Sequence, residues 1–148
     1  SKIMATTTAT VSISSSDLIP GGNISINGSS TLMKTGLTTG LDVLEMGKNI
    51  ITVSDSHKAL FQGGVAAADR DQAAYVYLCN NATDDTYHIE VTIHDTVVGR
   101  LYAGDWMFMP YSLGDNVAEL NIEAEGGSCE YDYALFATSK ALLDSSQA

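Results

Sequence analysis

The chain has 148 residues, of which 45% are hydrophobic, and it carries a net charge of −11. A chain of this length can form one domain with its own core. An acidic surface repels nucleic acid and anionic membranes, because both are polyanions. No apolar run approaches the roughly 18 residues of a transmembrane helix. We therefore expect a globular protein whose partners include neither nucleic acid nor membrane.

The negative charge is concentrated in the second half of the chain. Residues 1–70 carry five acidic and five basic residues, whereas residues 71–148 carry thirteen acidic residues and two basic ones. This asymmetry fits an ordinary solubilising surface. It also fits a chain with one neutral end that docks on a partner and one acidic end that faces solvent.

The N-terminal segment, residues 1–16, is dominated by Thr, Ser and Ala. It has too little apolar surface to offset its own ordering entropy, and Thr and Val favour extended structure over helix. We expect either a flexible tail or an extended arm that becomes ordered on a partner. Its candidate interface residues are Thr6, Thr7, Thr8, Thr10, Val11 and Ile13. The segment has no apolar core of a secretory signal, which favours synthesis in the cytoplasm.

Residues 17–53 read as short strands separated by turns, whereas residues 57–74 are ambiguous. Residues 20–23 (PGGN) form a strong turn signal, and residues 23–27 alternate with the period of a strand. Residues 41–46 have helical propensity, but Gly47 stops a helix there. Residues 65–74 are the best local helix candidate, although a loop across one end of a sheet is equally compatible.

Residues 75–138 show the clearest strand pattern. Apolar residues recur at every second position in three stretches, which places Ile89, Val91 and Ile93, then Leu120, Ile122 and Ala124, then Cys129, Tyr131, Tyr133 and Leu135 on buried faces. Turn signals recur every 8 to 12 residues, as is typical of β-sandwiches and barrels. We predict an all-β, antiparallel β-sandwich, jelly-roll-like or Ig-like, over residues 17–138, followed by a tail at 139–148.

The densest aromatic run lies at residues 101–110, LYAGDWMFMP. Gly104-Asp105 predicts a tight turn, so we expect the central hairpin of the sandwich here. Trp106 and Phe108 share one face and are expected in the core. Met107 and Met109 then lie on the opposite face, where a neighbouring subunit would cover them. A second tight turn is expected at Gly126-Gly127.

The sequence contains no recognisable catalytic or cofactor pattern. His88 and His94 lie about 20 Å apart if they share a strand, too far to bind one metal ion. Two alternatives remain: a calcium loop with Asn80, Asn81, Asp84 and Asp85 as ligands, and a glycan hydrolase that uses Glu123 and Glu125. We expect no enzyme activity, no cofactor and no metal. Cys79 and Cys129 are expected as reduced, buried thiols that lie close together if their strands are neighbours.

Residues 99–110 (GRLYAGDWMFMP) and 130–136 (EYDYALF) resemble small virion structural proteins of tailed bacteriophages. The resemblance covers roughly residues 75–138. It implies a capsid decoration (cement) protein that binds the major capsid protein and stabilises the shell. Such a protein would sit on the capsid surface of the virion as a homo-oligomer, with a trimer favoured. The alternative is a tail or fibre component that binds a host receptor or glycan.

Overall fold

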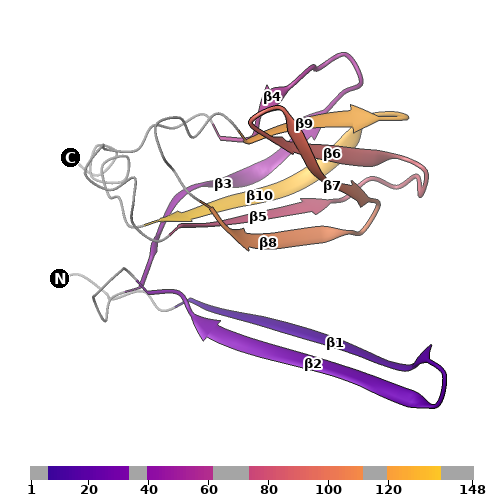
Figure 1. The fold of residues 1–148 in the computed structure, drawn as a ribbon. Coiled ribbons are helices and arrows are strands. Elements are labelled where there is room, and N and C mark those ends of the chain that lie inside the picture. The colour runs from indigo at the N-terminus through magenta and orange to yellow at the C-terminus, as the bar shows by residue number, and fades with distance from the viewer. Residues whose placement is uncertain (1–6, 34–39, 62–73, 112–119, 138–148) are drawn as a thin grey trace. The chain divides into compact units, whose positions relative to one another are not determined.

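The computed structural model describes residues 7–33, 40–61, 74–111 and 120–137, and these fall into two compact units (Figure 1). The first unit is residues 1–41 and the second is residues 42–148. Every regular element in the described residues is a strand, so these residues contain no helix that could span a membrane. The helix expected at residues 65–74, except Ala74, and the tail at residues 139–148 lie outside the described residues.

The first unit is a long β-hairpin of β1 (Thr8–Ile19) and β2 (Gly22–Thr31). Pro20-Gly21 forms the turn: proline fixes its own φ, and Gly21 takes the φ of +75° that the next position of a type II turn requires. The expected arm is therefore longer than residues 1–16 and folds back on itself. The expected boundary after residue 16 falls inside β1, and the two units divide after Leu41 instead.

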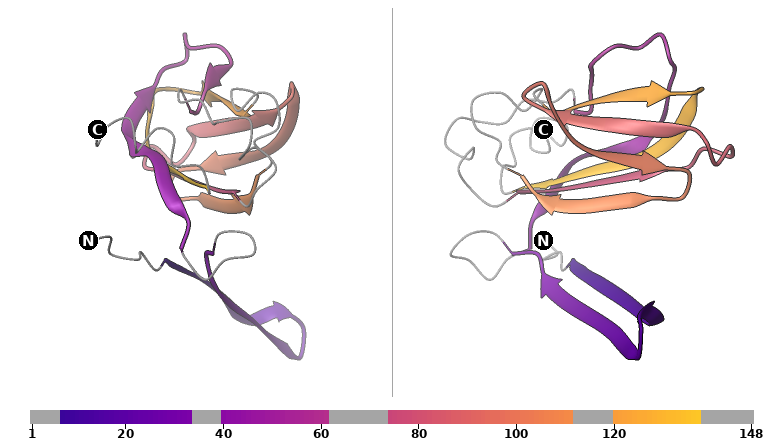
Figure 2. Two further views of the ribbon diagram at one scale, coloured as in Figure 1. Left: turned by 90° about the vertical axis from the view of Figure 1, so that its left-hand side faces the viewer. Right: turned by 45° about the vertical axis from the view of Figure 1, so that its right-hand side comes forward.

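The second unit has two four-stranded antiparallel sheets that face each other (Figure 2). One sheet has the order β3-β10-β5-β8, and the other has the order β4-β9-β6-β7. Their bounds are β3 Asp42–Ile51, β4 Lys58–Ala59, β5 Ala74–Asn80, β6 His88–Ile93, β7 Thr96–Tyr102, β8 Trp106–Pro110, β9 Leu120–Glu125 and β10 Cys129–Ala137. The predicted all-β antiparallel sandwich is confirmed.

The strand order distinguishes between the two architectures expected from the sequence. The first strand of the unit pairs with the last, β4 with β9, β5 with β8, and β6 with β7. Such nested pairing is one long hairpin rolled across two sheets, which is the jelly roll. Residues 42–46, where a helix was considered, form the first half of β3, because pairing with β10 outweighs local propensity.

The core lies between the two sheets and draws on both. The alternation read from the sequence places the expected side chains there. Its fully buried members include Val76, Leu78, Ile89, Val91, Leu120, Ile122, Cys129, Tyr131 and Leu135. Burying an aliphatic side chain of this size contributes about 1.5–3 kcal/mol to folding, so this double layer supplies the main stabilisation.

The two expected hairpin turns instead carry the chain from one sheet to the other. Gly104-Asp105 joins β7, which pairs with β6, to β8, which pairs with β5. Gly126-Gly127 likewise joins β9 to β10 across the sandwich. The turn residues were read correctly as turns, but a turn signal does not reveal whether the next strand pairs with the preceding one.

The orientation of β8 is the reverse of the expected one. Met107 pairs with Leu78 and Met109 with Val76, and residues paired across a ladder share a face. Both methionines therefore pack on the core. Trp106 and Phe108 face outward, and Trp106 is 52% exposed. Met107 and Met109 thus lie, partly buried, on the inner side of β8 and not on the outward face expected for a subunit contact.

Candidate interaction surfaces

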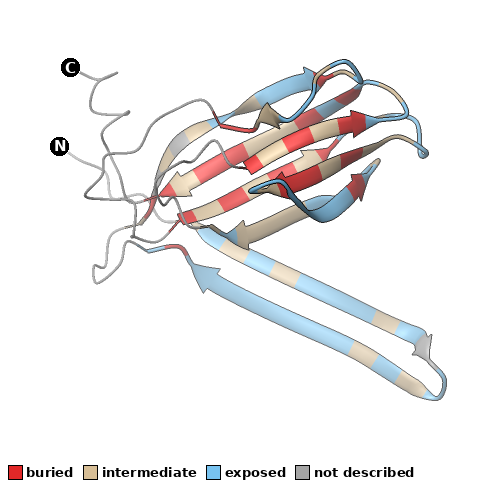
Figure 3. Ribbon diagram, turned by 45° about the horizontal axis from the view of Figure 1, so that its top comes forward, coloured by how far each residue is buried: buried red, intermediate tan, exposed pale blue. Residues whose placement is uncertain are grey.

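The β1–β2 hairpin presents one apolar face. At every second position along both strands the residue is small or aliphatic, and cross-strand pairing brings these residues together. We call the apolar members of this row the apolar stripe: Ala9, Val11, Ile13, Ile24 and Ile26. The same face also carries Ser15, Gly28 and Ser30. Ile13 and Ile26 lie directly opposite each other and are 51% and 54% exposed. Most of the hairpin is coloured as exposed in Figure 3. Among the residues that the structure describes, this ladder has two strands.

The opposite face of the hairpin is entirely hydroxyl and amide. It is made of Thr8, Thr10, Ser12, Ser14, Ser25, Asn27, Ser29 and Thr31. The Ser12 hydroxyl donates to Asn27 Oδ1 at 3.0 Å, and the Thr10 and Ser29 hydroxyls lie 3.4 Å apart. The interface residues predicted from the sequence thus divide between two faces. Val11 and Ile13 lie on the apolar stripe, Thr8 and Thr10 lie on the polar face, Thr7 lies just before β1, and Thr6 lies outside the described residues.

The second surface is the outer side of the β3-β10-β5-β8 sheet. Cross-strand register places a group of large apolar side chains there, on strands whose alternate residues enter the core. We call this group the aromatic face; it consists of Met46, Tyr75, Tyr77, Phe108 and Phe136. The Tyr75 and Phe108 rings are stacked, with centroids 5.3 Å apart, and Met46 is 68% exposed. Burial raises the pKa of Tyr77, and the neighbouring Cys79 and Asp132 raise it further.

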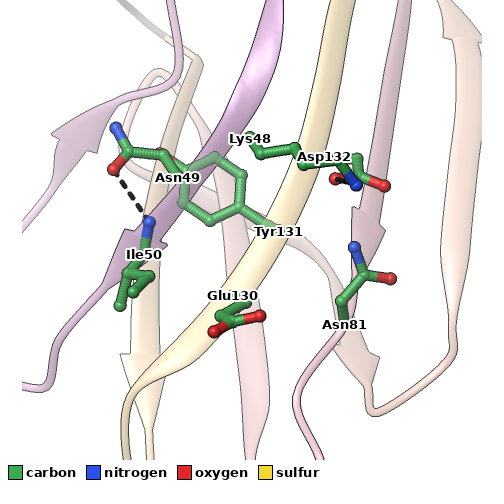
Figure 4. Close-up of a pocket in the computed structure, with 7 residues that line it drawn as sticks. All are labelled: Lys48, Asn49, Ile50, Asn81, Glu130, Tyr131 and Asp132. Carbon is green, nitrogen blue, oxygen red and sulfur yellow. Dashed lines mark hydrogen bonds and ion pairs between the residues drawn. The ribbon is translucent and has the colours of Figure 1, made fainter.

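One end of this outer side is polar. Lys48, Asn49, Ile50, Asn81, Glu130, Tyr131 and Asp132 line a shallow depression of about 430 Å³ (Figure 4). Lys48 Nζ lies 3.0 Å from Asp132 Oδ1. Hydrogen bonding from Asn81 and the charge of Lys48 lower the pKa of Asp132. The depression therefore presents a carboxylate that is already neutralised by its neighbours, and so lacks the raised pKa expected of a general acid or base.

Asn80 holds the corner between β7 and β8. It is fully buried, and its side chain donates to the Leu101 carbonyl at 2.7 Å and accepts from the Ala82 N–H at 2.8 Å. Its backbone bonds Gly104 and Asp105, at 2.8 and 2.9 Å. Because the Asn80 side-chain oxygen already accepts the Ala82 N–H, it is not available as a ligand for the calcium ion considered from the sequence. No three His, Cys, Asp or Glu side chains of the described residues are placed to hold a metal.

The outer side of the other sheet is charged. Arg100 Nε lies 3.3 Å from Glu90 Oε2, and Glu90 is the cross-strand partner of Glu123. Glu123 Oε1 accepts from the His57 N–H at 3.2 Å and from the Ser56 hydroxyl at 3.3 Å. Glu123 and Glu125 are thus neighbours on an outer sheet face, where Glu123 holds the loop before β4.

The two cysteines lie on opposite sides of one sheet. Cys129 is buried on the inner side, where burial raises the pKa of its thiol, and Cys79 faces outward on β5. β5 and β10 are neighbours, as was considered from the sequence, but Cys79 pairs with Asp132. Both thiols are free.

The aromatic face was not predicted as a surface from the sequence. A signal was present, since Tyr75 and Tyr77 alternate with Val76 and Leu78. A strand that is apolar on both sides belongs either to the middle of a large core or to a sheet with a second contact surface.

The chain matches no protein-family model, no curated protein and no solved structure in the comparisons made. We therefore infer the function from the fold and from these two apolar surfaces.

Proposed function

We propose that this protein is a structural component of a phage virion, most specifically a capsid decoration protein that binds the major capsid shell and stabilises it. The supporting observation is the hairpin arm. A two-stranded hairpin alone is at best marginally stable in water, and this one leaves aliphatic side chains exposed along one face. An arm of this kind gains stability by docking on another protein.

The charge distribution agrees with a docking arm. Asp17 is the only charged residue among residues 7–33, whereas residues 42–148 carry seventeen acidic residues and five basic ones. A ribbon with a single charge approaches another protein with little electrostatic repulsion, and the acidic unit resists nonspecific association. The jelly roll is shared by viral capsid domains and lectins, so the fold supports the proposal only by analogy.

The test uses capsid shells that lack this protein. The full-length chain is mixed with the shells, and the bound copies per shell are counted after sedimentation. Wild type is expected to bind at a fixed, saturable number of copies. Ile13→Asp places a charge on the apolar stripe and should reduce occupancy at least about tenfold, by loss of the contact of one buried side chain.

The matched control is Ser14→Asp, which adds the same charge at the next residue, on the polar face. It should bind like wild type. Absence of saturable binding by the folded wild-type chain would contradict the proposed function. Equal occupancy for both variants would show that the arm does not carry the binding.

A second candidate is a tail or fibre component that binds a host glycan. The outward Trp106 favours it, because exposed aromatic rings are suited to stacking against ligands. Binding of an isolated glycan by the wild-type chain, lost in Trp106→Ala, together with no binding to shells, would support this candidate over the first.

A further inference from the structure

The second unit carries an apolar surface of its own, and the hairpin needs one to dock on. We propose that the apolar stripe of one copy packs on the aromatic face of a second copy of this chain. The inference deepens the proposed function, because it names the first partner of the arm and gives the protein a route to its oligomer.

The two surfaces have compatible shapes and sizes. Both are faces of β-sheet, and sheets pack face to face through interdigitated side chains at about 10 Å. Ala9 and Ile13 are about 13 Å apart along β1 at roughly 3.3 Å per residue. The four strands that carry the aromatic face span about 14 Å at a spacing of roughly 4.8 Å. A two-stranded ribbon therefore fits across this face.

Charge favours the hairpin over a second acidic unit as the occupant. Residues 42–148 carry a net charge of −12, so two such units repel when they approach each other. The residues of the aromatic face are themselves uncharged, and so are those of the apolar stripe. Contact between them buries apolar area from both sides without burying an unpaired charge.

The arrangement has a consequence for symmetry. Each copy offers one stripe and one aromatic face, which are different surfaces, so the contact is of the donor–acceptor kind. Such contacts form closed assemblies either by reciprocal exchange in a dimer or by a ring of three or more copies. The trimer expected from the resemblance is one of the allowed closures.

The first experiment is disulfide trapping between full-length chains. One chain carries Ile13→Cys and the other carries Tyr77→Cys, with different tags, and both carry Cys79→Ser to remove the outward native thiol. They are refolded together and mildly oxidised. We expect a disulfide-linked heterodimer in high yield, and a Phe108→Cys chain should also couple if the Tyr77 variant folds poorly.

The control chain carries Ser14→Cys, next to Ile13 but on the polar face, and should couple at least about tenfold less. Coupling only between two Ile13→Cys chains would overturn the proposal, because it would show hairpin-to-hairpin packing. A single chain with both cysteines that closes its own disulfide while remaining monomeric would overturn it in favour of docking within one copy.

The second experiment measures mass in solution by light scattering. Wild type should have a multiple of the 15.6 kDa chain mass. Ile13→Asp and Phe108→Asp should each lower the measured mass to that of a single chain, whereas Ser14→Asp should leave it unchanged. A monomeric wild type whose shell binding still depends on Ile13 would overturn this inference and leave the proposed function standing. An oligomer that depends on Ile13 but does not bind shells would support this inference and contradict the proposed function.

Discussion

Replacing Asn80 tests whether one buried amide holds the corner of the sandwich. Asn80→Leu keeps nearly the same size but removes both side-chain hydrogen bonds, at 2.7 and 2.8 Å. The Leu101 carbonyl then loses its partner at a buried position, and the Ala82 N–H loses its partner at a partly buried one. Each unsatisfied buried group costs about 1–3 kcal/mol, so we expect a loss of about 2–5 kcal/mol in the free energy of unfolding.

The assay is urea unfolding followed by circular dichroism and by the fluorescence of Trp106, which lies beside the corner. Asn81→Leu is the matched control, because Asn81 is the exposed neighbour, and it should cost less than about 1 kcal/mol. An Asn80→Leu protein within about 0.5 kcal/mol of wild type would refute the assignment of the corner to this side chain.

Asn80→Asp adds a pH dependence with a defined sign. A buried carboxylate facing the Leu101 carbonyl disfavours its charged form, so the pKa of this Asp should be higher in the folded chain than the roughly 3.9 of an unfolded one. The protonated acid can donate to the carbonyl as the amide does. The free energy of unfolding of Asn80→Asp should therefore be closest to that of wild type below about pH 4. The difference should grow as the pH rises through the folded-state pKa. A deficit independent of pH would contradict this reasoning.

Two further predictions concern packing and alkaline stability. A Cβ at Gly127 would overlap the Tyr87 ring, so Gly127→Ala should lower the free energy of unfolding by about 1–3 kcal/mol, and adding Tyr87→Leu should recover part of the loss in a double-mutant cycle. Burial, reinforced by Tyr133, raises the pKa of Tyr131 to about 12 from 10.0, so its contribution to stability is complete below about pH 10 and is lost as the pH rises towards 12. Tyr131→Phe should reduce the fall in the free energy of unfolding between about pH 10 and pH 12. An unchanged fall would contradict the assignment of this loss to Tyr131.

The sequence revealed which side of most strands is buried, but not which strands are neighbours. Period-two alternation is local, so Leu120, Ile122 and Ala124 could be assigned to the core from the sequence. Pairing is not local, because β3 meets β10 from the far end of the chain. This is why Gly104-Asp105 was correctly read as a turn but wrongly assigned to a hairpin.

Strand β8 shows where alternation fails. Its sequence, WMFMP, is apolar on both sides, so the pattern alone cannot assign an inner face. The pairing of Met107 with Leu78 decides it. For the hairpin arm a signal existed: Val11 and Ile13 alternate before Pro20-Gly21, and Ile24 and Ile26 alternate after it. Its Thr and Ser content had favoured an arm without internal structure.

The nested pairing of the sandwich also sets when the protein can finish folding. β10 is the last described strand along the chain, yet it lies inside its sheet, between β3 and β5, and Asp42 pairs with Ala137. Until β10 has left the ribosome, β3 has no partner, and contacts between residues so distant in sequence form slowly. Phe136 of the aromatic face arrives with the same strand. A chain truncated or stalled before β10 thus lacks both its closing strand and an intact contact surface, so the emergence of β10 decides which chains become competent to assemble.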